Sequence, residues 1–164
     1  MRRYNLLFLC TGNSARSILA EALLNVLGGD RFIAYSAGSH PSGQVQPLAT
    51  EVAAELGYDT ARLRSKSWDE FAAPGAPAMD FIITVCDSAA GEACPFWPGY
   101  PVTAHWGVPD PAAVRGDEVA RRSAFRHAAA TLRRRIELLI ALPETRLDGL
   151  AAHASLQAIA EATR

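Results

Sequence analysis

The sequence lacks an excess of charge of either sign. Its 164 residues include 16 lysine or arginine and 17 aspartate or glutamate residues, which gives a net charge of −1 at pH 7. Proteins that attract nucleic acid or anionic membranes at long range usually carry a clear positive excess. We therefore expect neither nucleic acid nor a membrane as a partner, and any bound anion must be held by local geometry.

A long apolar run is also missing. No stretch approaches the ~20 residues that a membrane-spanning helix needs. The run from Tyr4 to Cys10 is at the lower limit for the core of a secretory signal, and the polar stretch after it has no small-residue cleavage pattern. These features predict a cytoplasmic protein.

Cysteine is scarce, and the three residues Cys10, Cys86 and Cys94 are odd in number. This argues against a secreted disulfide framework and fits a reducing compartment, where a cysteine is either a buried hydrophobe or a reactive group. A zinc site is disfavoured, because seven residues separate Cys86 from Cys94 and only His105 is nearby as a further ligand. We expect no metal at these cysteines.

What is present is an alternation of short apolar runs and helical patterns. The expected strands cover residues 4–9, 32–37, 81–85 and 102–106, and the expected helices cover 17–27, 45–56, 117–142 and 147–162. This order predicts a parallel sheet with helices on both faces, in a single α/β domain spanning residues 1–164. We interpret Arg133, Arg134 and Arg135 as a solvent-exposed face of the long helix rather than a binding patch.

The motif that carries chemistry follows the first expected strand. The stretch LCTGNSARS places Cys10 at the end of a strand and Arg16 at the start of a helix. Ligands bind at this edge of open α/β sheets, where loop amides and a helix N-terminus converge. The small residues between can let the backbone curl into a nest of N–H donors around a tetrahedral oxyanion. These residues are Thr11, Gly12, Asn13, Ser14 and Ala15.

In such a loop Arg16 would grip two oxygens of the anion with its planar, permanently charged fork. The amides and the helix dipole would lower the pKa of Cys10 and make its thiolate a nucleophile. Ser17 could donate a hydrogen bond to that thiolate. The alternative is an inert buried cysteine followed by a plain turn.

The stretch LCTGNSARS resembles the phosphate-binding loop of the low-molecular-weight protein tyrosine phosphatase superfamily, and more closely that of the phosphatase-like arsenate reductases. The similarity runs from Tyr4 to about Leu142 and includes YSAGSHPSGQVQPLA at 35–49. It implies a three-layer α/β/α fold with a four-stranded parallel sheet.

The resemblance also implies a redox role for the other two cysteines. Cys10 would form a covalent adduct with arsenate, Cys86 would attack Cys10 to release arsenite, and Cys94 would attack Cys86 to carry the disulfide to the surface. A phosphatase needs neither, because water hydrolyses its intermediate. The pair therefore favours arsenate as substrate, with phosphate or sulfate as competing oxyanions. Two buried structural cysteines are the alternative.

The spacing of these two cysteines predicts a conformational change. If the segment between them is helical, eight steps of ~1.5 Å put their Cα atoms about 12 Å apart, beyond the roughly 7 Å over which a disulfide can form. We therefore expect a mobile loop at 89–93 that unwinds, with Gly91 easing the change.

The stretch HWGVPDP places Asp110 between two prolines, which favour an extended backbone that can lie over an anion site. By the resemblance, Asp110 would protonate the leaving oxygen, and the alternative is a simple turn aspartate. Ala112 stands where phosphatases of the superfamily usually carry an aromatic residue, which disfavours phosphotyrosine as substrate.

Two further features depart from the resemblance. Ala15 stands where many relatives have a second loop cysteine, so Cys10 is the only thiol of the loop. The spacing from Cys86 to Cys94 is slightly longer than in many thioredoxin-coupled members. We expect thioredoxin as the external reductant, with glutaredoxin and glutathione or another low-molecular-weight thiol as the alternative, and no bound cofactor.

Some thioredoxin-coupled relatives bind potassium near the loop, and the resemblance would place that ion at Asn13, Glu21 and Ser36. The alternative is that Asn13 shapes the turn and Glu21 lies on an exposed helix face.

Three functions stay open at this point. They are arsenate reduction by the three cysteines, phosphomonoester hydrolysis by Cys10, Arg16 and Asp110, and non-enzymatic binding or sensing of an oxyanion.

Overall fold

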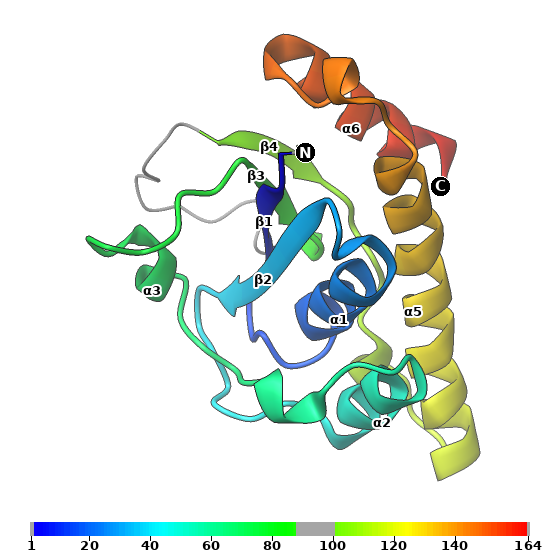
Figure 1. The fold of residues 1–164 in the computed structure, drawn as a ribbon. Coiled ribbons are helices and arrows are strands. Elements are labelled where there is room, and N and C mark those ends of the chain that lie inside the picture. The colour runs from blue at the N-terminus through cyan, green and yellow to red at the C-terminus, as the bar shows by residue number, and fades with distance from the viewer. Residues whose placement is uncertain (1, 88–100, 164) are drawn as a thin grey trace.

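The computed structural model of the chain describes residues 2–87 and 101–163. Four parallel strands form one sheet in the order β2-β1-β3-β4 (Figure 1). The strands are β1 (Tyr4–Cys10), β2 (Phe32–Gly38), β3 (Phe81–Thr84) and β4 (Val102–His105). Every expected strand is confirmed, with its ends displaced by one residue at most.

The four expected helices are also present, as α1 (Arg16–Gly28), α2 (Pro47–Glu55), α5 (Glu118–Ile140) and α6 (Gly149–Ala162). Helix α2 begins two residues later than expected because Pro47, whose fixed φ suits the first helical position, starts it. The side chain of Asp117 caps α5 by accepting a hydrogen bond from the N–H of Ala120. The short α3 (Asp69–Ala72) was not expected, because a single turn leaves no periodic pattern to read.

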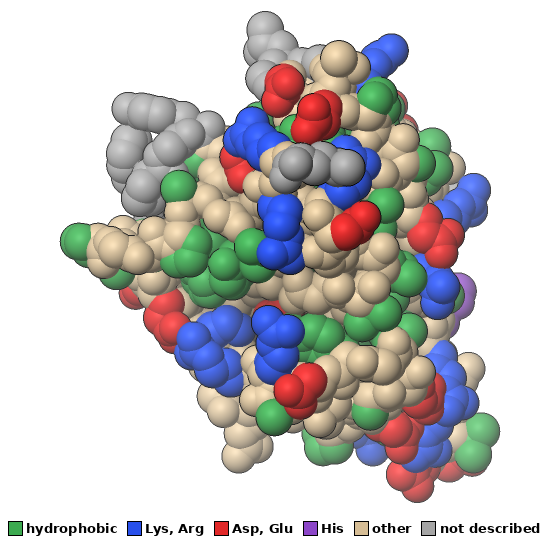
Figure 2. All heavy atoms as spheres, viewed as in Figure 1, with side chains coloured by type: hydrophobic (Ala, Val, Ile, Leu, Met, Phe, Trp, Pro, Cys, Tyr) green, Lys and Arg blue, Asp and Glu red, His purple; other side chains and the backbone are tan. Residues whose placement is uncertain are grey.

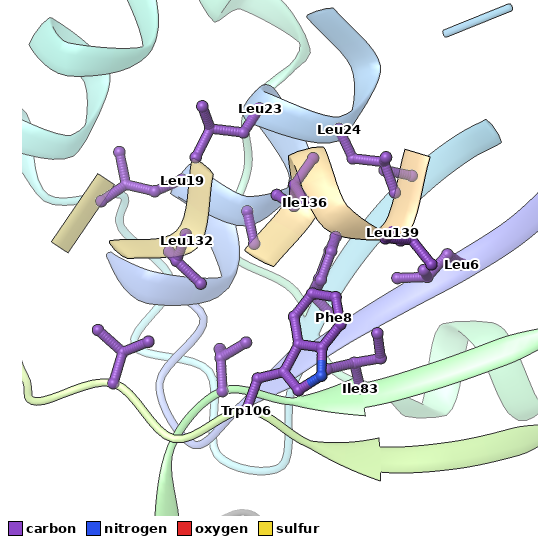
Figure 3. Close-up of a cluster of buried hydrophobic side chains, with 14 of the residues drawn as sticks. Leu6, Phe8, Leu19, Leu23, Leu24, Ile83, Trp106, Leu132, Ile136 and Leu139 are labelled. Atoms are coloured by element: carbon purple, nitrogen blue, oxygen red, sulfur yellow. The ribbon is translucent and has the colours of Figure 1, made fainter. Parts of the chain in front are cut away.

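Strand β1 contributes to two cores, because successive side chains of a strand point to opposite faces of the sheet. Leu6 and Phe8 pack under α1 and α5 with the larger set of buried side chains (Figure 3). Leu7 and Leu9 pack on the other face, with Phe71 of α3. The chain therefore has the three-layer α/β/α architecture that the resemblance implies.

Helix α6 packs against β4 (Figure 1). The indole N–H of Trp106, which follows β4 and is fully buried, donates a hydrogen bond to the carbonyl of Leu156 at 3.1 Å. The ring Nδ1 of His153 lies 3.0 Å from the carbonyl oxygen of Thr103 in β4. Both contacts tie α6 to the strand that leads to Asp110.

The expected exposure of the arginine triplet is wrong for Arg135, which is only 5% exposed. Arg135 lies three residues after the buried Leu132, so it falls on the packed face of α5. Its guanidinium donates to the carbonyl of Gly107 at 3.0 Å and to the hydroxyl of Thr163 at 2.9 Å. A buried cation thus joins α5, α6 and the segment after β4.

Acidic and basic side chains alternate where α2 and α5 lie side by side (Figure 2). Arg122 binds Glu51 with two nitrogens, and Arg126 lies 2.6 Å from Glu55. Two arginines of α5 are therefore balanced by carboxylates on α2. Within 2–87 and 101–163, no helix is long and apolar enough to cross a bilayer.

Two leucines of α5 test how far the sheet depends on this helix. Leu132 is fully buried and Leu138 is 40% exposed. Leu132→Ala should lower the free energy of unfolding by about 2–5 kcal/mol, because it leaves a cavity in the core. The matched change Leu138→Ala should lower the free energy of unfolding by less than about 1 kcal/mol, because this side chain is partly exposed. Urea unfolding measures both values, and equal losses would contradict the packing described.

Candidate active site

The sheet topology brings the described members of the predicted catalytic set to one edge. Cys10 ends β1, Cys86 follows the neighbouring β3, and Asp110 follows β4. The carboxyl ends of parallel strands share an edge, and a crevice forms there where the strand order reverses, next to β1. A cleft of about 690 Å³ opens there, and its described lining is Arg16, Cys86, Asp87, Gly107, Val108, Pro109 and Asp110.

The loop after Cys10 is held by its carbonyl groups. Three of them accept hydrogen bonds of 2.9–3.0 Å from backbone N–H groups of the segment 40–46. The pairs are His40 with Thr11, Ser42 with Gly12, and Gln46 with Ser14. The C=O and N–H of a trans peptide point in opposite directions, so carbonyl groups that bind the outer segment are compatible with amides that face the inside of the loop. The nest of donors expected from the sequence stays a prediction.

Asn13 shapes that loop. It is the only non-glycine residue with positive φ in the described part of the chain, at 45°, and its side chain is fully buried. Asparagine tolerates this left-handed conformation better than most residues. Its Oδ1 accepts the N–H of Lys66 at 2.9 Å, and its Nδ2 donates to Ser17 Oγ at 2.8 Å. The turn-shaping alternative for Asn13 is therefore confirmed, and donation from Ser17 to Cys10 stays a prediction.

Arg16 begins α1 and is oriented by the segment after β4. One terminal nitrogen donates to the carbonyl of Val108 at 2.9 Å, and the other lies 3.9 Å from Asp110 Oδ2. Its Nε is buried and has no hydrogen-bond partner among the described residues. The N-terminus of α1 has neither a side-chain cap nor an acidic residue in its first turn. These unused donors suit an anion.

Cys10 and Cys86 form a buried thiol pair. Both side chains are buried, 4% and 2% exposed, and Cys86 lies near enough to Cys10 to raise the pKa of its thiol. The N–H of Thr11 also donates to Cys86 Sγ, at 3.3 Å. The structure thus brings together the nucleophile and the thiol that the resemblance assigns to attack it. The reaction between them stays a prediction.

The pKa of Cys10 differs from the prediction. The sequence predicts a lowered pKa, but the hydrogen bond with Cys86 raises it most, and burial raises it further. The charge of Arg16 and the N–H of Thr11 act in the opposite direction without reversing the result. The prediction is wrong because a neighbour distant in sequence outweighs the local loop.

Removing the thiol of Cys86 should lower the pKa of Cys10. In a Cys94→Ser background, Cys86→Ala should move the midpoint of Cys10 alkylation by iodoacetamide to lower pH, because Arg16 then acts against burial alone. Cys86→Ser, which keeps a hydrogen-bonding group, should move it less. The pH dependence of the alkylation rate measures both, and an unchanged midpoint in Cys86→Ala would contradict the role of the thiol pair.

Asp110 has one oxygen in a turn and the other at the site. Its Oδ1 caps the short helix Pro111–Ala113 by accepting the N–H of Ala112 at 3.0 Å. Its other oxygen faces Arg16, and the side chain is 43% exposed in the cleft. The turn fixes a carboxyl group that solvent and a bound oxyanion can both reach. Its role as general acid stays a prediction.

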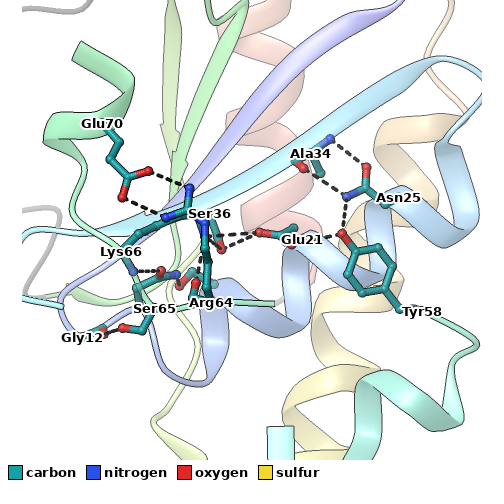
Figure 4. Close-up of polar contacts among 12 residues, drawn as sticks. Gly12, Glu21, Asn25, Ala34, Ser36, Tyr58, Arg64, Ser65, Lys66 and Glu70 are labelled. Carbon is teal, nitrogen blue, oxygen red and sulfur yellow. Dashed lines mark hydrogen bonds and ion pairs between the residues drawn. The ribbon is translucent and has the colours of Figure 1, made fainter. Parts of the chain in front are cut away.

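Sequence reasoning missed two supports of the loop, Gly38 and Ser65. Ser65 Oγ donates to the carbonyl of Gly12 at 3.1 Å (Figure 4). A Cβ atom on Gly38 would lie 2.4 Å from the carbonyl oxygen of Thr11 and 3.0 Å from the N of Asn13. The only available signal was a glycine at the end of a strand, where close backbone approach is common.

Gly38→Ala should therefore disturb the loop. The clash with Thr11 should cost about 1–3 kcal/mol of stability and weaken phosphate binding, because the loop amides must shift. Gly75→Ala is the control, since its Cβ would meet nothing and only its positive φ of 85° is unfavourable. Thermal unfolding and phosphate titration of both variants measure this, and wild-type phosphate affinity in Gly38→Ala would contradict it.

The remaining predicted residues have mixed outcomes. Glu21 is 5% exposed, so its interpretation as an exposed helix residue is wrong. Its carboxylate and Ser36 lie next to Nζ of Lys66, and the potassium ion expected there stays a prediction. Within the described ranges, no three His, Cys, Asp or Glu residues cluster as metal ligands. Cys94 and the expected mobile loop at 89–93 lie outside the described residues.

Comparison with known proteins agrees with this geometry. A family model described as low molecular weight phosphotyrosine protein phosphatase matches residues 5–149. An arsenate reductase of Halalkalibacterium halodurans is 34% identical over 137 residues, covering 84% of this chain and 95% of that protein. One from Bacillus subtilis is 34% identical over 130 residues, covering 79% and 90%.

Solved structures of arsenate reductases and of a low molecular weight phosphatase have a similar fold. A crystal structure of arsenate reductase from Archaeoglobus fulgidus superposes with a TM-score of 0.65 at 27% identity, covering 84% of this chain and 99% of that chain. A low molecular weight protein tyrosine phosphatase from T. tengcongensis gives a TM-score of 0.66 at 26% identity, covering 84% and 97%.

Proposed function

This chain belongs to the low molecular weight phosphotyrosine protein phosphatase family, and we propose that it is an enzyme that reduces arsenate to arsenite. The observation that carries the proposal is the pair of buried thiols, Cys10 and Cys86: Cys86 Sγ lies 3.3 Å from the N of Thr11, the residue after Cys10, and so sits beside the oxyanion loop. A phosphatase has no use for the second thiol. The similarity to arsenate reductases over most of both chains supports the same choice.

In the first step the thiolate of Cys10 attacks the arsenic atom of arsenate. A sulfur–arsenic bond forms, an arsenic–oxygen bond breaks, and Asp110 supplies the proton with which the oxygen leaves as water. Arg16 and the loop amides hold the remaining oxygens and stabilise the charge that develops on them. The unpartnered Nε of Arg16 supports this assignment.

In the second step Cys86 attacks Cys10. The sulfur–sulfur bond forms while the sulfur–arsenic bond breaks, and its electron pair stays on arsenic. Arsenic(V) is thereby reduced to arsenic(III), and the two thiols are oxidised to a disulfide. Cys86 Sγ already lies 3.3 Å from the N of Thr11, next to Cys10, and the two strands are neighbours in the sheet, which supports a direct attack.

A third thiol has a physical reason in this site. A disulfide between Cys10 and Cys86 would form where the two residues are 4% and 2% exposed, so a protein reductant could not reach it. Attack of Cys94 on Cys86 would free Cys10 and move the disulfide outward. An external dithiol would then reduce it, with thioredoxin the first choice and glutaredoxin or a low-molecular-weight thiol the second. The cytoplasm is the compartment that would supply such a reductant.

Hydrolysis of phosphomonoesters is the second candidate. It needs only Cys10, Arg16 and Asp110, which the first step of arsenate reduction also uses, and Arg16 lies 3.9 Å from Asp110 Oδ2. Phosphate and sulfate would compete with arsenate for the same loop.

Replacing Cys94 separates these functions. Cys94→Ser should limit arsenate reduction with thioredoxin to a single turnover, because the buried disulfide cannot be recycled, while hydrolysis of an aryl phosphate continues at the wild-type rate. Cys10→Ser should abolish both activities. Multiple-turnover arsenite formation and release of the phenolate measure the outcome.

Normal multiple-turnover reduction by Cys94→Ser would rule out its role in the relay. A wild-type protein that binds arsenate but performs neither reaction would instead support non-enzymatic oxyanion binding.

A further inference from the structure

A buried ammonium group lies behind the oxyanion loop. Lys66 is the only lysine of the sequence and is 7% exposed. Its Nζ lies 3.8 Å from Glu21 Oε1 and donates to Ser36 Oγ at 3.4 Å and to the carbonyl of Arg64 at 2.9 Å (Figure 4). A lysine is seldom buried without a partner, and the partner here is a buried carboxylate.

Glu21 needs a cation at this position. Its carboxylate, on α1, is 5% exposed and accepts hydrogen bonds from Ser36 Oγ at 2.7 Å and from the hydroxyl of Tyr58 at 3.1 Å. Two neutral donors do not offset the cost of burying a carboxylate. Within the described ranges, Lys66 is the cation within 4 Å of it, while the neighbouring Arg64 forms its ion pair with Glu70.

The backbone of the same lysine holds the loop. The N–H of Lys66 donates to Asn13 Oδ1 at 2.9 Å, and its carbonyl accepts the N–H of Gly38 at 2.9 Å. Asn13 is the residue whose positive φ shapes the loop, and Gly38 is in close contact with the loop backbone. Lys66 thus has a buried side chain on Glu21 and a backbone that is bonded to Asn13 of the loop.

We infer that Lys66 is a positioning residue whose ammonium serves as an internal monovalent cation, holding Glu21 and Ser36 together so that its backbone can fix Asn13. The protein would then need no potassium ion at the three residues where the resemblance expects one. The inference rests on the proposed use of this loop to bind oxyanions, which both candidate reactions share.

The inference leads to a specific expectation for a truncated side chain. Lys66→Ala would leave a space bordered by a carboxylate, a hydroxyl and a backbone carbonyl oxygen. Oxygen donors of this kind suit hard cations, so an alkali ion should be able to replace the lost ammonium. Lys66→Met would fill the same space with an apolar chain and leave no room for an ion.

The experiment compares phosphate binding in potassium chloride and in choline chloride at equal ionic strength, by calorimetry. The wild-type affinity should be the same in both salts. Lys66→Ala should bind about tenfold more weakly in choline, about 1.4 kcal/mol, and recover in potassium, whereas Lys66→Met should stay weak in both. Arg64→Ala is the matched control, because it removes an exposed cation of the same segment, and it should behave as wild type.

Three results would overturn the inference: a potassium requirement in the wild type, wild-type affinity of Lys66→Ala in choline, or no recovery of a folded Lys66→Ala in potassium. If Lys66→Ala is unfolded in both salts, Lys66→Gln decides, and wild-type phosphate affinity of that variant in choline would contradict the role of the charge. Phosphate binding without arsenate reduction would count against the proposed function alone.

Discussion

The carboxamide of Asn13 joins the loop to the first turn of α1 and to the distant segment at Lys66. Its oxygen binds the backbone of Lys66, its nitrogen binds Ser17 of α1, and its own backbone has a positive φ in the middle of the loop. An unfavourable φ persists only where the surroundings determine it strongly. These two hydrogen bonds provide that constraint, so the loop amides are oriented by the fold itself. Such preorganisation is what lets fixed dipoles stabilise charge during a reaction.

The elements around the loop were predictable because their signals are local. Strands β1 and β3 are buried on both faces and appear in the sequence as continuous apolar runs. Cys10 and Arg16 could be assigned to one site because the strand and the helix that carry them are consecutive. The parallel sheet then brings the segment after β3 to the same edge without further information.

The buried cations and the pKa of Cys10 could not be predicted for the same physical reason. Lys66 and Arg135 look like surface residues in any local window, and only partners from other elements make their burial tolerable. The loop and the helix dipole argue for a low pKa of Cys10, whereas Cys86, which β3 supplies, raises it. Charge and proton affinity inside a protein depend on contacts that the chain makes across long sequence distances.

Helix α6 extends past the residues matched by the family model. It also bears on self-association, because it packs against a strand at the edge of the sheet. Strand β4 is at the border of the sheet, where unpaired backbone groups can accept a strand from another molecule. The contact of His153 with the carbonyl of Thr103 occupies one such group, and the packing of α6 against β4 shields that border of the sheet. Helix α6, which is bonded to the strand that leads to Asp110, therefore also protects this edge strand from pairing with a strand of another molecule.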